Sequence, residues 1–437
     1  MPMSARMRSD GKKSGITQPS QGTICRAKQS RKLIHFRGTR QHTEEFRMDT
    51  LILRNARRSV PGFLLVLLIL SSAAVQGADS QQPVRARNVV LIIGDAGGLS
   101  ALHAGSLYHH NKPNGLFIQS LPHIALMDTS ASDVWVTDSA AGVTALVTGQ
   151  KTNNGVLSQA NDAVRGKKDG TFLKTILEYA EERGLSTGVM TNVPVTDATA
   201  AGCYAHTNDR ANTAEIIKQF LAPRFGDGVD VLIGAGRQNV IMAADALDID
   251  LKAELQKRGY GFFKKPEDVL ASRGRVVGVF PTMDFDLPAQ VQHAIGRLSQ
   301  NPKGYFLMVE CDVHTDKLKL GLDHIAVLDR IVREVVERVG EDTLVIFGAD
   351  HSFDIRVRGG KPGQPMLDGD QPASSGEPPK PFIRVDNGHS GEHVLVAATG
   401  PGAEKVRGFI ANSDLFGIMM AAFGWAPEGT RREISSR

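Results

Sequence analysis

Seven short apolar runs, separated by helical patterns, most constrain what this chain can fold into. Several runs are apolar at consecutive positions, as in NVVLIIG and TLVIFG, instead of alternating with polar residues. Consecutive apolar positions are typical of strands buried on both faces of a parallel sheet. We therefore predict strands at residues 88–94, 186–191, 229–234, 275–280, 304–310, 343–348 and 393–399.

Helical patterns fill the gaps between these runs. The clearest is 321–339, where apolar residues from Leu322 to Val336 recur along one stripe. Alternation of strand and helix over this length predicts an α/β fold, with a central, mostly parallel β-sheet sandwiched by helices on both faces. The other predicted helices lie near 138–148, 171–183, 211–221, 289–300 and 412–423.

The N-terminal residues have a different composition. Residues 1–47 are rich in Lys, Arg, Ser, Gln and Gly, and we interpret them as a non-native or disordered extension. Residues 48–78 have a basic start, a short apolar run at 63–70 and small residues after it, which is typical of a cleaved signal peptide. The run is shorter than the roughly 20 residues of a membrane span, so no stable membrane anchor is expected. The sequence thus predicts export to a periplasmic or extracellular location.

The remaining residues, 79–437, are expected to form a single domain with a Gly/Pro-rich insertion at 356–388. The 1–58 segment holds 14 Lys/Arg against 4 Asp/Glu, so the rest of the chain holds 37 basic and 43 acidic side chains. A mildly acidic folded part argues against nucleic-acid binding. Cys203 and Cys311 are the two cysteines outside the leader, and their sequence positions leave open whether they form a disulfide.

Acidic and histidine residues follow three of the predicted strands directly. Ligand sites in open α/β sheets lie at the carboxyl ends of strands. A single Asp there is often a helix N-cap, but three acidic clusters would repel one another unless a divalent cation lies between them. Two histidines further along the chain, His389 and His393, add to this pattern. The candidate metal ligands are Asp95, Glu310, Asp312, His314, Asp350, His351 and His389.

Two further segments carry candidate residues. Ser139 begins a run of small residues that predicts a helix, and a helix N-terminus attracts phosphate, although Asp-Ser is also a common N-cap. Asp197 and Thr199 offer oxygen ligands suited to Mg²⁺, and the planar fork of Arg210 suits a phosphate. A polar turn between a strand and a helix is the alternative interpretation of residues 192–210.

Taken together, these motifs resemble the alkaline phosphatase family over residues 86–425. The matching segments are Gly94-Asp95, Thr137-Asp138-Ser139-Ala140, Asp197-Ala-Thr199, Ala349-Asp350-His351 and His389-Ser-Gly391. The resemblance implies a catalytic nucleophile, Ser139, a phosphate-binding residue, Arg210, and a site with two zinc ions and one magnesium ion. It implies Asp95 as a bridging ligand.

The resemblance also implies which of the three ions each of the other ligands would bind. It implies Asp350 and His351 at the zinc beside the serine, and His389 at the other zinc. The magnesium ligands would be Asp197, Thr199 and Glu310.

One segment departs from the family pattern. The family has Met-Val-Glu and, further on, Asp-x-x-x-His, whereas here the continuation is compressed to Cys-Asp312-Val-His314-Thr-Asp316. His314 is the expected zinc ligand, and we favour Asp312 over Asp316 as its acidic partner. The resemblance implies hydrolysis of small-molecule phosphate monoesters through a phosphoserine, and a homodimer, for which nothing in the sequence marks an interface.

Two alternatives stay open at this point. One is another hydrolase of the same superfamily, such as a phosphodiesterase, a sulfatase or a phosphonate hydrolase. The sulfatase is disfavoured because Ser139 is followed by Ala-Ala-Gly-Val instead of the x-Pro-x-Arg that sulfatases use. The other alternative is a non-enzymatic metal- or phosphate-binding protein on the same scaffold.

Overall fold

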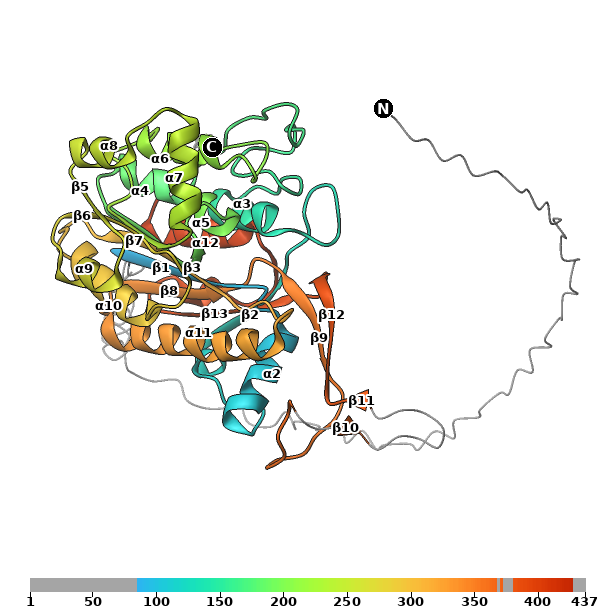
Figure 1. The fold of residues 1–437 in the computed structure, drawn as a ribbon. Helices are drawn as coiled ribbons and strands as arrows, with labels where there is room; N and C mark the ends of the chain where they lie inside the picture. Colours follow the sequence, from blue (N-terminus) through green and yellow to red (C-terminus); the bar gives the residue numbers. More distant parts are fainter. Residues whose placement is uncertain (1–84, 368–369, 372–379, 427–437) are drawn as a thin grey trace, which may run out of the picture. The chain divides into compact units, whose positions relative to one another are not determined.

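The computed structural model describes residues 85–367, 370–371 and 380–426. Ten strands form the central sheet in the order β14-β2-β13-β8-β1-β7-β3-β4-β6-β5 (Figure 1). Only β13 runs opposite to its neighbours, because it pairs antiparallel with both β2 and β8. The predicted α/β fold with a mostly parallel central sheet is confirmed.

The strands of the central sheet are short, and those at its centre are buried along their whole length. Their bounds are β1 Asn88–Asp95, β2 His123–Asp128, β3 Ser186–Pro194, β4 Val231–Ala235, β5 Tyr260–Phe263, β6 Arg275–Val279, β7 Tyr305–Asp312, β8 Thr343–Gly348, β13 Val394–Thr399 and β14 Gly408–Ala411.

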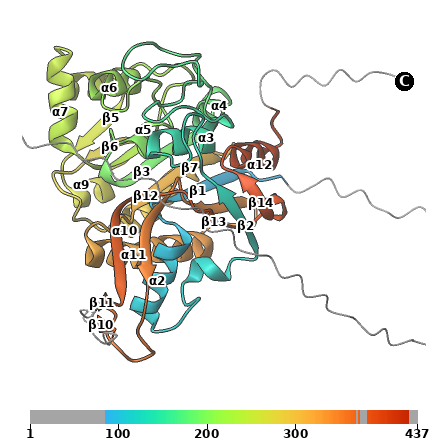
Figure 2. The same ribbon diagram turned by 90° about the vertical axis from the view of Figure 1, so that its right-hand side faces the viewer.

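Helices cover both faces of this sheet, as Figure 2 shows from a second direction. One apolar core packs under α2 (Leu99–His110), α9 (Pro266–Ala271), α10 (Leu287–Leu298) and α11 (Leu318–Arg338). The other core packs under a second set of helices. These are α3 Ser139–Thr148, α4 Ile176–Glu182, α5 Ala198–Ala201, α6 Thr213–Leu221, α7 Arg237–Ala246, α8 Leu251–Lys257 and α12 Asp414–Phe423.

All seven predicted strands and all six predicted helices are present; β8 has the predicted bounds, and the other elements have shifted ends. The helix predicted at 171–183 begins only at Ile176, because Thr175 caps it by accepting from the Glu178 N–H at 3.1 Å. The sequence analysis missed β2, β5 and β14, whose residues are partly polar or exposed, and it missed α2, α5, α7, α8 and α9. β5 and β14 are the two edge strands of the sheet, and β2, although it lies between β14 and β13, is only partly buried. Partly buried strands have a weaker apolar pattern than fully buried ones, which explains why these three were missed.

The Gly/Pro-rich stretch belongs to a two-stranded antiparallel ribbon. Its strands β9 (Ser352–Val357) and β12 (Ile383–Ser390) pair from Ser352 opposite Ser390 to Val357 opposite Ile383. Near the tip, β10 (Asp370–Gln371) pairs with β11 (Lys380–Pro381). Residues 368–369 and 372–379 of the predicted insertion lie outside the described residues.

Both cysteines of the described chain are free and buried. Cys203 packs in the core on the α3 side of the sheet, whereas Cys311, on β7, faces the core on the α11 side. The open question of a Cys203–Cys311 disulfide is therefore answered by the structure: the sheet separates the two thiols.

The predicted extension at 1–47 and the predicted signal peptide at 48–78 lie outside the described residues. Within the part of the chain that is described, no helix is long and apolar enough to cross a membrane.

Glu181 offers a test of this packing away from the strand ends. Its carboxylate accepts hydrogen bonds from the Thr187 hydroxyl and, at 3.0 Å, from the Gly228 N–H. Burial raises the pKa of Glu181 from 4.5 to about 7, and the neighbouring Asp230 carboxylate adds to the rise. Between these values the folded chain keeps a proton that the unfolded chain releases, so this group's contribution to stability is lost as pH rises from 4.5 to 7.

We predict that Glu181→Gln weakens the pH dependence of stability. The amide does not titrate; its oxygen can accept from the Gly228 N–H while its NH2 group donates to the Thr187 hydroxyl. The loss of unfolding free energy between mildly acidic and mildly alkaline pH therefore shrinks by on the order of 3 kcal/mol, and the fall in Tm shrinks with it. Thermal unfolding across pH measures this. Glu182→Gln, at a more exposed neighbouring carboxylate, is the matched control and keeps the wild-type slope. An unchanged slope in Glu181→Gln would contradict the prediction.

Candidate active site

Parallel register brings the acidic residues of three neighbouring strands to one edge of the sheet. Asp95 ends β1 and lies opposite Asp312 of β7, and Ile93 lies opposite both Glu310 and Gly348. The Asp350-His351 pair follows β8 directly after Ala349. The parallel pairing of β8, β1 and β7 therefore explains why the residues at the ends of these strands lie together in space.

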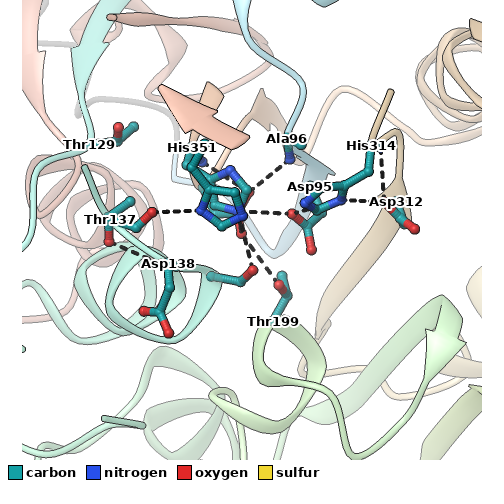
Figure 3. Close-up of polar contacts among 12 residues, drawn as sticks. Asp95, Ala96, Thr129, Thr137, Asp138, Thr199, Asp312, His314 and His351 are labelled. Atoms are coloured by element: carbon teal, nitrogen blue, oxygen red, sulfur yellow. Dashed lines mark hydrogen bonds and ion pairs between the residues drawn. The ribbon is translucent and has the colours of Figure 1, made fainter. Parts of the chain in front are cut away.

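The first cluster consists of Asp95, Asp350 and His351, which offer ligand atoms within 4.8 Å of one another. All three are buried. His351 Nε2 lies 3.1 Å from Asp95 Oδ1 and 3.5 Å from Asp350 Oδ2. In Figure 3 the His351 imidazole lies between Asp95 on one side and the Thr137–Asp138 segment on the other.

The first cluster contains two buried carboxylates, whose ionised forms need a positive charge beside them. Burial, together with the nearby Asp95 carboxylate, raises the pKa of Asp350 to about 7. Burial also opposes ionisation of Asp95, but the adjacent His351 and His314 hold its pKa below the ordinary value. Two buried carboxylates so close together are stable in the ionised form only beside a cation.

Three imidazoles form the second cluster: His314, His351 and His389, again with ligand atoms within 4.8 Å. The rings of His351 and His389 are stacked, with centroids 3.7 Å apart. His389 Nδ1 donates to the Thr137 carbonyl oxygen at 2.8 Å. This hydrogen bond places the proton on Nδ1 and leaves Nε2 as the ligand atom, which is the orientation of a metal-binding histidine.

Asp312, and not Asp316, lies beside His314. Asp312 Oδ1 accepts from the His314 backbone N–H at 2.9 Å and is 2.6 Å from His314 Nδ1 (Figure 3). Asp316 is exposed. Burial opposes the charged ring, but the Asp312, Asp95 and Asp350 carboxylates together raise the pKa of His314 to about 9. The compressed segment thus still supplies one imidazole to the second cluster and places one carboxylate beside that imidazole.

Ser139 begins α3 and its hydroxyl faces the first cluster. Ser139 Oγ is 3.2 Å from His351 Nε2, and the side chain is almost fully buried. Asp138 caps the helix by accepting from the Ala141 N–H at 3.0 Å. The small residues of α3 are required by close packing, because a Cβ on Gly142 would lie 2.7 Å from the Asp350 carbonyl oxygen.

Arg210 is held by two carboxylates, one of which, Asp138, directly precedes Ser139 in the chain. Its Nη1 donates to Asp138 Oδ2 at 3.2 Å and its Nη2 donates to Asp197 Oδ1 at 2.9 Å. Burial disfavours the charge, but the Asp197 and Asp138 carboxylates raise the pKa of Arg210 above its ordinary value. The guanidinium is therefore a permanent positive charge, and its ion pair with Asp138 ties it to the residue that precedes Ser139.

Thr199 and Glu310 lie on the inner side of the same region. Thr199 Oγ1 donates to Asp350 Oδ2 at 3.5 Å. Glu310 is fully buried, and neither carboxylate oxygen has a hydrogen-bond partner among the described residues. Burial raises the pKa of Glu310 well above its ordinary value, and Asp95 and Asp197 add to the rise. A buried carboxylate without a donor, beside two others, fits an oxygen-ligated cation.

The structure adds positioning residues that the sequence analysis missed. Asn154 Oδ1 accepts from the Asp138 N–H at 3.0 Å, and Asn192 Oδ1 accepts from the Asp312 N–H at 2.8 Å. No sequence signal points to either, because each acts through a neighbour far along the chain. His393, noted as a downstream histidine, packs against Phe409 with ring centroids 5.5 Å apart and belongs to neither cluster.

Comparison with known proteins identifies the family. The family profile described as Alkaline phosphatase matches residues 86–375. The chain belongs to the alkaline phosphatase family. It is accordingly a phosphatase, and the family implies metal cofactors, in agreement with the two clusters of candidate ligands.

Curated relatives resemble this chain over most of their length. Alkaline phosphatase 4 of Bacillus subtilis is 27% identical over 80% of this chain and 94% of its own. The streptomycin-6-phosphate phosphatase of Streptomyces griseus is 28% identical over 84% of this chain and 97% of its own. The human tissue-nonspecific alkaline phosphatase is 26% identical over 71% of both chains.

Solved structures share the fold. A mutant of the TAB5 alkaline phosphatase, described with Mg bound in its M3 site, has a TM-score of 0.66 and 26% identity over 79% of this chain and all of its own. The alkaline phosphatase of Thermus thermophilus has a TM-score of 0.66 over 81% of this chain and 95% of its own, at 23% identity.

Removal of divalent cations tests the clusters. A chelator removes the cations that the clustered Asp95, Glu310 and Asp350 carboxylates would bind, so we predict a lower Tm. The stabilisation lost is about 2.7 kcal/mol in unfolding free energy for each ion held at a hundredfold over its Kd. Thermal unfolding with and without added zinc measures the difference. Asp312→Asn should reduce the gain on adding zinc, whereas Asp316→Asn, the matched control, should keep it. Equal gains in both variants would contradict the assignment of Asp312.

Proposed function

We propose that this phosphatase is an exported alkaline phosphatase that hydrolyses phosphate monoesters through a phosphoserine intermediate, at a site with two zinc ions and one magnesium ion. The observation that carries the proposal is the Ser139 hydroxyl at the N-terminus of α3, 3.2 Å from His351 and beside the carboxylates and imidazoles of both clusters.

The donor sets suggest how the residues divide among the ions. Asp312, His314 and His389 would hold the first zinc, Asp350 and His351 would hold the second, and Asp95 would serve two of the three ions. Imidazole nitrogen with carboxylate oxygen is a usual zinc environment. The all-oxygen set of Asp197, Thr199 and Glu310 suits magnesium. When bound, the ions supply the positive charge that favours an ionised serine and stabilises charge on the reacting phosphoryl group.

The chain's own residues carry out two substitutions at phosphorus. Ser139 Oγ attacks phosphorus, the bond to the ester oxygen breaks, and the alcohol leaves after taking up a proton. The product is a phosphoserine, which water then attacks to release inorganic phosphate and restore Ser139. The N–H groups at the start of α3 and the Arg210 fork offer donors to the non-bridging oxygens, whose charge they stabilise.

Asp138 has a positioning role in this proposal. It caps the nucleophile helix and also accepts from Arg210, so it fixes the relative placement of the serine and the phosphate-binding guanidinium. Such preorganisation reduces the entropy lost on reaching the transition state.

Substitution of the serine tests the mechanism. We predict that Ser139→Ala lowers turnover of a chromogenic aryl phosphate by on the order of 10³-fold or more, because no covalent intermediate can form. The nearby exposed Ser132→Ala is the matched control and keeps wild-type turnover. Mass spectrometry of acid-quenched enzyme should find phosphate on the peptide containing Ser139. Chelator-sensitive turnover that survives in Ser139→Ala would discard the phosphoserine and keep a metal-dependent hydrolase.

A phosphodiesterase of the same superfamily is the alternative. The Arg210 fork, held between Asp138 and Asp197, favours a monoester, whose terminal phosphoryl group has three non-bridging oxygens to bind. We expect kcat/KM for an aryl phosphate to exceed that for the matching bis-aryl phosphate diester. The reverse order would move the protein to the diesterase branch.

Export is proposed from the composition of residues 48–78 alone. N-terminal sequencing of the protein recovered from the culture medium or periplasm tests it. A start near residue 79 supports cleavage of a signal peptide, and recovery of residues 1–47 in the mature protein contradicts it.

A further inference from the structure

Three consecutive apolar side chains are exposed immediately before the nucleophile helix. Val134 is 42%, Trp135 86% and Val136 39% exposed. Trp135 is the most exposed large apolar side chain among the described residues, ahead of Phe409 at 76%. Single exposed apolar residues are ordinary on protein surfaces. A contiguous apolar patch that includes a tryptophan and lies next to a reaction site is instead typical of a surface that binds another molecule.

The loop that carries Trp135 is held firmly. Asp133 Oδ1 accepts from the Asn154 N–H at 3.0 Å, and the Val136 carbonyl oxygen accepts from Asn154 Nδ2 at 3.3 Å. The Ser132 N–H donates to the Thr152 carbonyl oxygen at 2.8 Å. Hydrogen bonds on both sides of Trp135 therefore fix the backbone of this residue. The exposure of the indole is thus determined by the structure of the loop.

The same loop borders the site. One residue after Val136, the Thr137 carbonyl oxygen accepts from His389 Nδ1, and the His389 ring stacks on His351. The Trp135 carbonyl oxygen is 3.6 Å from the position of a Cβ on Gly391, two residues after His389. The Trp135 backbone is thus at the rim, between Ser139 and the end of β12.

We propose that Trp135 is a specificity-determining residue that provides an apolar platform for the organic group of the substrate, favouring phosphate monoesters of aryl and other flat apolar alcohols. The inference rests on the proposed function. In that function the phosphoryl group is bound by charged residues deep in the site, so the ester's organic substituent extends outward to the rim. The indole is the large apolar surface that the loop offers there, and aromatic rings pack on it by offset stacking.

A second copy of this chain is the competing occupant of the same surface. The substrate is favoured because one short, hydrogen-bonded segment carries both the indole and the nucleophile, four residues apart. That arrangement couples Trp135 to the position of Ser139, which a subunit contact does not require.

Kinetics on two esters test the proposal. We measure kcat/KM for p-nitrophenyl phosphate and for glycerol 2-phosphate, and take the ratio so that changes common to both esters cancel. Trp135→Ala should lower this ratio about tenfold, mainly through a higher KM for the aryl ester, and Trp135→Phe should restore most of it. Phe409→Ala, which removes an exposed aromatic ring from the edge strand β14, is the matched control and leaves both activities at the wild-type level.

Fluorescence gives a readout that does not depend on turnover. The chain has two tryptophans, and the other, Trp425, stacks on Phe423 with ring centroids 4.0 Å apart. p-Nitrobenzylphosphonate, which cannot be hydrolysed, should quench the exposed indole on binding, whereas inorganic phosphate should not. In Trp135→Phe the quenching should be lost while the phosphonate still inhibits turnover.

The outcomes distinguish a substrate-binding role of Trp135 from a subunit contact and from a failure of the proposed function. An unchanged ester ratio in Trp135→Ala, together with no quenching in the wild type, overturns the inference and leaves the proposed function intact. A change in oligomeric mass on light scattering with an unchanged ratio assigns the indole to a subunit contact and also overturns it. Absence of turnover on either monoester overturns the proposed function, and this inference with it.

Discussion

Three buried carboxylates at the ends of adjacent parallel strands impose the constraint on which the rest of the structure depends. Asp95, Glu310 and Asp350 are held together by strand pairing, out of water, where their mutual repulsion is largest. The fold tolerates this because imidazoles and a guanidinium surround them and because the clusters can bind cations. The sheet supplies rigidity, and the rigidity keeps the charges at fixed separations that a flexible loop could not maintain.

The helix that begins at Ser139 shows how packing serves this constraint. It approaches the Asp350 backbone so closely that Gly142 has no room for a side chain, and the small residues around it permit that approach. Helix α3 is therefore almost entirely buried, and its placement depends on its N-terminal cap. Asp138 supplies the cap and at the same time binds Arg210, so one carboxylate orders both the serine and the guanidinium.

The sequence predicted the sheet, its main helices and the residues at the strand ends, because buried strands have continuous apolar runs and the acidic residues follow them directly. Register could not be predicted, so the contact of Asp95 with His351 came only from the structure. Edge strands such as β14 (Gly408–Ala411) were missed because half-exposed residues give a weak pattern. Asn154 and Asn192 were missed because they position backbone atoms distant in sequence.

The ribbon strand that carries His389 lies outside the central sheet, so the two clusters depend on different parts of the fold. Asp95, Asp350 and His351 lie at the ends of the paired strands β1 and β8, and the middle of the sheet fixes their separations. The second cluster depends in addition on the pairing of β12 with β9, which brings His389 to the Thr137 carbonyl oxygen. The cluster that faces Ser139 is thus set by the sheet alone, whereas the imidazole cluster is set jointly by the sheet and the ribbon.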